Sequence, residues 1–303
     1  MYIVRFAQPD SAGPRVGVTE GELGSPVHAI DAGSLAELLA RSLAEIRSAV
    51  EQALAAAPVE GETRLLPPVD GRTEVWASGV TYERSRDARV EESTEKSVYE
   101  KVYEADRPEL FFKSVAWRVV TDGEPIGIRA DSDLNVPEPE VAIVISGAGE
   151  IVGYLVCDDV SSRVIEGENP LYLPQAKVYA GACALSAGIR PAWEVKDAGS
   201  LPITLSVTRA GAEVFHGETS TARMHRSFAD LARWLYAADA YPAGTILSTG
   251  TGIIPGLEFT LAEGDQVSIE VGGIGVLTNQ VAVGPQPFTF LLSPGADSFT
   301  RGA

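Results

Sequence analysis

Residues 135–160 read NVPEPEVAIVISGAGEIVGYLVCDDV, with apolar runs at 141–145 and 151–157 on either side of the turn sequence SGAGE. Two short apolar runs joined by a Gly-containing turn predict a β-hairpin. Such a hairpin returns the acidic end of its second strand to the acidic start of its first. The stretch therefore predicts a β-rich core with carboxylates gathered at one end of a strand pair.

The carboxylates of this stretch are spaced for a metal ion. In an extended segment, residues two apart point the same way, so Glu138 and Glu140 share a face, and the prolines between and before them stiffen the segment. A simple hairpin count places Asp158 opposite Glu138, whereas a bulge would place Asp159 there. Hard oxygen ligands of this number suit Mg²⁺, with Mn²⁺ or Ca²⁺ as substitutes. The alternative is a solvated acidic pair at a strand end.

Composition limits the classes of partner. The 303-residue chain has a formal net charge of -18, which argues against nucleic acid because a polyanion would be repelled. Cys157 and Cys183 lack zinc spacing, so we expect buried thiols in a reducing cytoplasm. We see no leader sequence at the first residues and no apolar stretch near the ~20 residues of a membrane span, so we expect no membrane partner.

Working outward, the chain divides near residue 70. A capping pattern at Ser34 and Glu37 begins a predicted amphipathic helix of about five turns that extends to Leu54. Residues 55–70 have the composition of a linker, so we expect a small N-terminal α+β domain at 1–70 and a catalytic domain at 71–303. A second helix is predicted from Phe228 to Ala238. The fold class is α+β and β-rich.

Several segments resemble the fumarylacetoacetate hydrolase superfamily: PEPE at 137–140, GYLVCDDVSSR at 153–163, PQAKVYAGACALSAG at 174–188, STGTG at 248–252 and the EGDQVSIEVGGIGVLTNQV ending. The resemblance implies a mixed β-roll around a metal, homodimers or homotetramers, and a small 2-oxo acid substrate. It also implies that Glu138, Glu140 and Asp159 are the metal ligands, which leaves Asp158 without a role.

One departure from the family concerns the reaction. Hydrolases of this family carry an N-Y-x-x-H motif whose His activates water, but here the segment reads TYERS at 81–85. Together with PELFFKS at 108–114 and ENPLYLPQAKVY at 168–179, it resembles the branch that dehydrates 2-keto-3-deoxy sugar acids in pentose catabolism. We therefore expect conversion of a substrate such as 2-keto-3-deoxy-D-arabinonate to 2,5-dioxopentanoate through a metal-stabilised enolate, which is a hydro-lyase reaction.

Two residues are candidates for acid–base work in that reaction. Lys177 would remove a C3 proton, since a nearby cation disfavours the charged lysine, although carboxylates oppose this effect. Glu109 would protonate the departing C4 hydroxyl. Lys177 could instead pair with the metal-site carboxylates, and Glu109 with Lys113. The resemblance implies further substrate contacts around them: Arg84, Ser85, Lys113, Arg163, Tyr172, Gln175 and Thr251. Phe111 and Phe112 are expected in the core.

Other functions remain open at this level. An acylpyruvate or diketo-acid hydrolase that cleaves a C–C bond would use the same Mg²⁺ site with another water activator. A decarboxylase or isomerase would fit the metal equally well. A binding protein without turnover is the alternative outside enzymology, and Lys177 beside the carboxylates argues against it.

Overall fold

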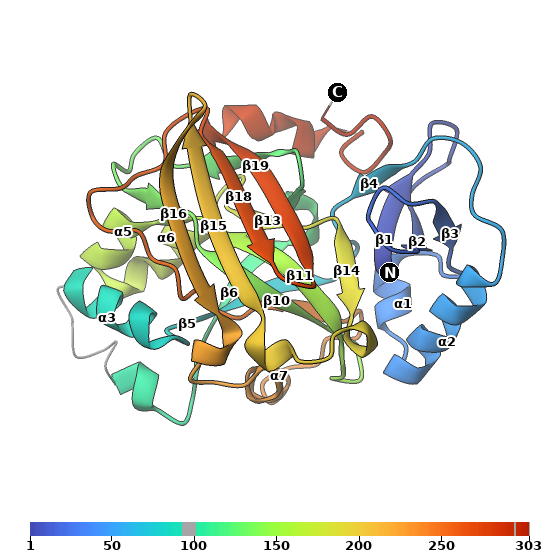
Figure 1. Ribbon diagram of the computed structural model, residues 1–303, viewed down its shortest axis with the longest axis horizontal. Helices are drawn as coiled ribbons and strands as arrows, with labels where there is room; N and C mark the ends of the chain where they lie inside the picture. Colours follow the sequence, from blue (N-terminus) through green and yellow to red (C-terminus); the bar gives the residue numbers. More distant parts are fainter. Residues whose placement is uncertain (93–100, 294, 303) are drawn as a thin grey trace.

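The computed structural model describes residues 1–92, 101–293 and 295–302, and two stacked sheets dominate it (Figure 1). The larger sheet has twelve strands and the smaller has five. Three of the strand pairs are parallel and the others are antiparallel. The chain thus has the β-rich mixed α+β fold that the sequence predicts.

The larger sheet runs in the order β3 (Val27–Ala29), β2 (Arg15–Thr19), β1 (Tyr2–Ala7), β14 (Gly188–Pro191), β11 (Ile151–Asp159), β10 (Pro139–Ile145), β17 (Thr245–Ser248), β5 (Glu74–Gly79) and β6 (Glu109–Val115). Beside this path lie β4 (Arg64–Leu66), β7 (Val120–Thr121) and β13 (Cys183–Leu185). The smaller sheet runs in the order β16 (Ala212–Ser220), β15 (Pro202–Arg209), β18 (Gln266–Val271), β19 (Gly275–Val283) and β8 (Pro125–Ile128). A separate pair joins β9 (Asn135–Val136) to β12 (Ser161–Ser162).

The helices are short and lie around these sheets. They are α1 (Leu35–Leu39), α2 (Leu43–Leu54), α3 (Glu83–Glu92), α5 (Arg163–Glu168), α6 (Leu173–Lys177) and α7 (Phe228–Tyr236). Short 3₁₀ helices also occur: η1 (Ala116–Arg118), η2 (Pro170–Tyr172), η3 (Ala192–Glu194), η4 (Ala198–Ser200), η5 (Thr221–Arg223) and the longer η6 (Gln286–Leu292). Ser227 caps α7 by accepting a hydrogen bond from the Asp230 N–H at 3.1 Å, as the sequence predicts.

The predicted helix from Ser34 to Leu54 is wrong in one respect, because the structure divides it into α1 and α2. Ser42 interrupts it by forming its own capping box, in which its side chain accepts from Glu45 N and Glu45 accepts from Ser42 N. A reciprocal cap satisfies two backbone donors at once, so a new helix begins there. The apolar spacing alone did not reveal this break.

The hairpin β10–β11 is buried on both faces. Val141, Ile143 and Ile145 contribute to the core between the two sheets. Ala142 and Val144 face a second core that includes the apolar face of α1 and α2. Because successive side chains of a strand alternate between faces, burial of both faces requires a continuous apolar run, which is what residues 141–145 provide.

The register of this hairpin contains a one-residue shift. Val144 lies opposite Gly153 but Ile145 lies opposite Ile151, so Val152 is an extra residue on β11. Beyond the shift, Pro139 faces Asp158, and Asp159 N donates to Glu138 O at 3.0 Å. A one-residue offset moves every later side chain to the other face. The bulge therefore puts Asp159, and not Asp158, on the face of Glu138 and Glu140.

Residues 1–70 pack closely on the rest of the chain. β1 pairs with β14, and Leu38 on α1 shares a core with Val144. Asp70 accepts hydrogen bonds from the first N–H groups of α1 and forms an ion pair with Arg5 at 3.0 Å. The boundary near residue 70 stays a prediction.

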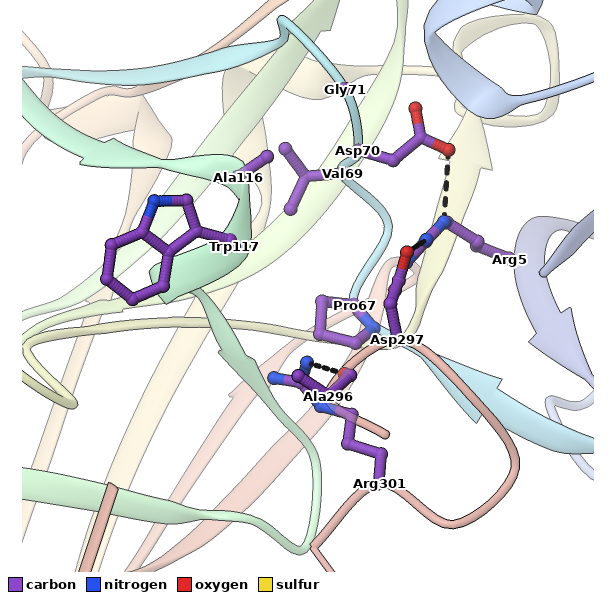
Figure 2. Close-up of a pocket in the computed structure, with 10 residues that line it drawn as sticks. All are labelled: Arg5, Pro67, Val69, Asp70, Gly71, Ala116, Trp117, Ala296, Asp297 and Arg301. Atoms are coloured by element: carbon purple, nitrogen blue, oxygen red, sulfur yellow. Dashed lines mark hydrogen bonds and ion pairs between the residues drawn. The ribbon is translucent and has the colours of Figure 1, made fainter. Parts of the chain in front are cut away.

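A cavity lies where three parts of the chain meet (Figure 2). Arg5 comes from β1, Trp117 from η1, and Asp297 and Arg301 from the C-terminal segment. Arg5 also pairs with Asp297, and Arg301 Nε lies 2.5 Å from Glu124 Oε1. The chain's own carboxylates neutralise the arginines of this cavity, so its charge gives no reason to expect a bound anion. The Arg5–Asp297 ion pair joins the N-terminal strand to the C-terminal segment.

Leu38→Ala tests whether residues 1–70 fold separately. Leu38 is fully buried, so truncation should lower the free energy of unfolding by about 2–5 kcal/mol. All four tryptophans, Trp76, Trp117, Trp193 and Trp234, follow residue 70. If the shared core couples the two parts, the urea midpoint read from tryptophan fluorescence falls in Leu38→Ala and stays unchanged in the exposed control Gln52→Ala. An unchanged midpoint in Leu38→Ala would support an independent N-terminal domain.

Candidate metal centre and active site

Three carboxylates converge at the end of the β10–β11 hairpin. Glu138, Glu140 and Asp159 each offer an oxygen, and these oxygens lie within 4.8 Å of one another. All three side chains are buried, with no more than 3% of each residue exposed. Buried acids held this close repel one another unless a cation or a proton compensates. The group therefore has the composition and spacing of a site for a hard divalent cation.

Two lysines supply part of the compensating charge. Lys177 Nζ, at the end of α6, lies 2.7 Å from Glu138 Oε2, 3.2 Å from Asp159 Oδ2 and 2.5 Å from Ser161 Oγ. Lys113 on β6 pairs with Asp159 from the other side and donates to the backbone oxygen of Lys177 at 2.6 Å. Lys113 thus ties a carboxylate of the cluster to the segment that carries Lys177.

Glu140 is held by the strand beside it. Its Oε2 accepts from Ser248 Oγ at 2.5 Å and from Gly250 N at 2.7 Å. Gly250 has φ of 91°, a left-handed conformation that favours glycine, and this conformation turns its N–H toward the carboxylate. Burial, followed by the charges of Asp159 and Glu138, raises the pKa of Glu140 well above its usual range. A bound cation would reverse that effect.

Asp158 points away from this cluster and serves the backbone. Its Oδ1 accepts from Glu138 N at 3.0 Å, which fixes the segment that carries the first glutamate. The side chain is fully buried, and burial raises its pKa to about 8. Asp158 therefore supports the site without belonging to the three converging carboxylates.

A small cavity opens onto the carboxylates. It is lined by Ser78, Gly79, Val80, Ser85, Glu109, Phe111, Glu138, Glu140, Asp159, Glu166, Lys177, Gly250 and Thr251. Of the residues expected from the sequence, the structure brings Ser85, Glu109, Lys177 and Thr251 together with the metal-site acids. Glu109 lies against Gly79 of the neighbouring strand, where any side chain would clash with its carboxylate.

Five expected substrate contacts lie outside that lining, and two of them are arginines. Lys113 is buried beneath it, as described above. Tyr172 is 37% exposed on η2, and Gln175 is exposed on α6, where its backbone oxygen accepts from Arg129 at 3.0 Å. Their roles toward a substrate stay predictions.

The two arginines expected at the pocket differ in burial. Arg84 is exposed on α3, one residue before Ser85, whose Oγ donates to Tyr82 O at 2.8 Å. Arg163 is buried on α5, with Nη2 3.9 Å from Glu138 Oε1 and Nη1 3.5 Å from Pro255 O. Arg163 is therefore a buried neighbour of Glu138, and Arg84 is an exposed neighbour in sequence of the lining residue Ser85.

Sequence reasoning missed several lining residues. Glu166 is 4% exposed and faces the cavity from α5, and its position three residues after Arg163 on one helical turn was an available signal. Phe111 was expected in the core but lines the cavity, with its ring centre 5.8 Å from Lys177 Nζ. Successive side chains of a strand point to opposite faces, so Phe111 and Phe112 lie on different faces of β6. Phe112 packs on Trp76, and Phe111 points to the cavity. No local sequence pattern indicates that Val80 adopts φ of 53° at this wall.

None of the three histidines lines this cavity. His28 Nδ1 lies 2.8 Å from Ala56 O, His216 lies beside Glu213 and Glu218, and the ring of His225 stacks on Tyr103 at 4.5 Å. Within the described part of the chain, the site thus contains carboxylates and a lysine as its titratable groups.

This arrangement defines the class of protein. Residues 74–282 match the fumarylacetoacetate (FAA) hydrolase C-terminal family, and the chain belongs to that family. It is 44% identical over 224 residues to 2-dehydro-3-deoxy-D-arabinonate dehydratase of Saccharolobus solfataricus, covering 73% of this chain and 75% of that one. It is 46% identical over 214 residues to a probable 2-keto-3-deoxyxylonate dehydratase of Haloferax volcanii, covering 71% and 73%.

A solved structure extends the similarity to the fold. A 2-keto-3-deoxy-D-arabinonate dehydratase complexed with magnesium and 2,5-dioxopentanoate matches with a TM-score of 0.78 and 35% identity, over 94% of this chain and 99% of that one. The likeness includes residues on both sides of position 70. Among the described residues, no helix combines the length and apolar character of a membrane span.

Asp158→Asn tests the electrostatics of the site. Because the pKa of Asp158 rises from 3.8 to about 8, the folded chain keeps a proton that the unfolded chain releases between those values. This contribution to stability is present below pH 4 and is lost as pH approaches 8, with a slope of at most about 1.4 kcal/mol per pH unit.

In EDTA, the free energy of urea unfolding should therefore fall less steeply with pH in Asp158→Asn than in the wild type. Glu263→Gln, an exposed acid-to-amide change, should leave the slope unaltered. Equal slopes in Asp158→Asn and wild type would contradict the raised pKa.

Proposed function

We propose that this protein is a Mg²⁺-dependent dehydratase that converts a 2-keto-3-deoxy sugar acid, such as 2-keto-3-deoxy-D-arabinonate, to 2,5-dioxopentanoate. The observation that carries the proposal is the buried cluster of Glu138, Glu140 and Asp159 in one cavity with Lys177 and Glu109. Its occurrence in a chain 44% identical to 2-dehydro-3-deoxy-D-arabinonate dehydratase supports this reaction over others.

The carboxylates fit the metal. Three buried acids with oxygens inside 4.8 Å form a hard-oxygen donor set, and few protein carboxylates leave room for substrate oxygens. Bound Mg²⁺ would polarise the 2-oxo group of the substrate and make its C3 proton acidic. Mn²⁺ or Ca²⁺ offers the same preference for oxygen.

Lys177 is the proposed base at C3. Its Nζ lies within 3.2 Å of two carboxylates that would hold the metal, and the proposal is that a substrate bound there would present its C3 proton to this amine. Glu109 is the proposed acid that protonates the departing C4 hydroxyl. It enters the cavity from β6, whereas Lys177 ends α6, so the two groups reach the cavity from different elements.

The remaining residues either hold the catalytic groups in position or are proposed to contact the substrate. We assign Lys113 to positioning, because its ammonium bonds to Asp159 and to the backbone of Lys177. Arg163 supports Glu138 in a similar way. Thr251 is proposed to contact the substrate carboxylate from the cavity lining. Ser85, another lining residue, is a proposed contact to the sugar hydroxyls. Arg84, Tyr172 and Gln175 are also proposed contacts.

The setting of the protein is also proposed. Two free buried cysteines support a reducing cytoplasm, and the family resemblance supports a homodimer or homotetramer. The acidic charge argues against nucleic acid. The catalytic part is proposed to be residues 71–303, with 1–70 as a smaller domain that packs against it.

A direct assay tests this function. Purified protein with Mg²⁺ should consume 2-keto-3-deoxy-D-arabinonate and form 2,5-dioxopentanoate, and EDTA should abolish the reaction. The L-configured analogue tests stereochemistry, and an acylpyruvate tests the hydrolase alternative. Release of pyruvate from the acylpyruvate without water loss from the sugar acid would identify a C–C hydrolase, and inactivity on all substrates would indicate a binding protein.

Glu109→Gln and Lys177→Met test the acid–base assignment. Each should lower kcat by about 10²–10⁴-fold, because each removes a proton-transfer group. Both should still bind Mg²⁺ when measured by calorimetry, since the three carboxylates remain. Lys196→Met provides a control at a lysine outside the cavity lining and should keep normal turnover. Near-normal rates in both site variants would overturn the assignment.

A further inference from the structure

We infer that Glu166 is a second catalytic carboxylate, which removes a proton from C5 of the substrate and completes the conversion to the aldehyde. This inference rests on the proposed function. Glu166 belongs to no motif in the sequence, yet the residue lines the cavity that contains Lys177 and the metal-site acids.

The position of Glu166 is unusual for a glutamate on a short surface helix. Only 4% of the residue is exposed, whereas Glu168 on the same helix is exposed. α5 follows β12 directly, so its first turn starts four residues after Asp159. Arg163 on this turn approaches Glu138, and Glu166 on the next faces the cavity. Glutamate is almost never buried to this degree unless it is paired, and the packing of α5 holds this carboxylate at the cavity wall.

The chemistry of the reaction needs such a group. Removal of a C3 proton by Lys177 and departure of the C4 hydroxyl with a proton from Glu109 yield water and 5-hydroxy-2-oxopent-3-enoate. This enone is an isomer of 2,5-dioxopentanoate. Its conversion requires a C5 proton to leave, and C5 lies two carbons from the position that Lys177 serves.

The enone is then isomerised to the aldehyde. Glu166 takes a C5 proton, and the C5–H electron pair forms the C4=C5 double bond while the C3=C4 pair shifts toward the 2-oxo group. Lys177 returns its proton to C3. Glu166 returns its proton to C4 as the C5 hydroxyl proton passes to Glu109. The products are water and the aldehyde, and all three side chains regain their starting protonation.

This sequence of steps uses three proton carriers, and the described lining of the cavity supplies Lys177, Glu109 and one further carboxylate that does not belong to the metal cluster. That carboxylate is Glu166. Glu109 and Glu166 enter from β6 and α5, which allows one to serve the leaving group while the other serves the terminal carbon.

Glu166→Gln tests this role. The variant should still consume substrate at a rate within about 10-fold of wild type, but it should form aldehyde at least about 100-fold more slowly. The enone should therefore accumulate, and the vinyl protons at C3 and C4 make it visible by ¹H NMR. Glu168→Gln on the same helix should make aldehyde at the wild-type rate without enone.

Two results would overturn the role of Glu166. One is aldehyde formation by Glu166→Gln at a near-normal rate. The other is loss of substrate consumption itself in a variant whose circular dichroism and Mg²⁺ affinity match the wild type. If Glu166→Gln does not fold, Glu166→Asp serves instead: it keeps the carboxylate but shortens its reach, and a C5-dideuterated substrate should then slow aldehyde formation and not water loss. Failure of the wild type to release water would refute the proposed function, which is a separate outcome.

Discussion

The site depends on the concentration of buried negative charge at one end of the β10–β11 hairpin. Glu138, Glu140 and Asp159 can lie within 4.8 Å of each other only because cations and hydrogen bonds compensate them. Lys113, Lys177, Ser248 and the Gly250 N–H come from three different segments to do so, β6, α6 and the end of β17. Each of these segments is therefore fixed relative to the hairpin, and the walls of the cavity follow from that arrangement.

The sheets explain how the chain can hold this charge. Both faces of β10 and β11 are packed, one against the smaller sheet and the other against a core shared with α1 and α2. Such a rigid support resists the repulsion between the acids, which would otherwise move them apart. The site lies where the apolar alternation ends and carboxylates replace aliphatic side chains on the same face.

The sequence was informative where a pattern repeats over a short distance. The hairpin, the glutamate pair and the cap at Ser227 could be predicted because alternation and capping are local. The choice of Asp159 over Asp158 could not be derived from spacing, since it depends on a single extra residue at Val152. The resemblance to the family selected Asp159, and the register gives the physical reason. Glu166 and Phe111 were missed because burial beside a cavity depends on tertiary packing.

The contact between Lys177 and the metal-site acids has a consequence for the form without metal. Lys177 Nζ lies 2.7 Å from Glu138 and 3.2 Å from Asp159, so the chain carries an internal counterion at the place where a divalent ion would be attracted. In the absence of the ion, Lys177 still provides positive charge beside the acids. This charge reduces the repulsion between the strands that carry them. A metal ion that binds here would therefore compete with the ammonium group of Lys177 for the same carboxylate oxygens.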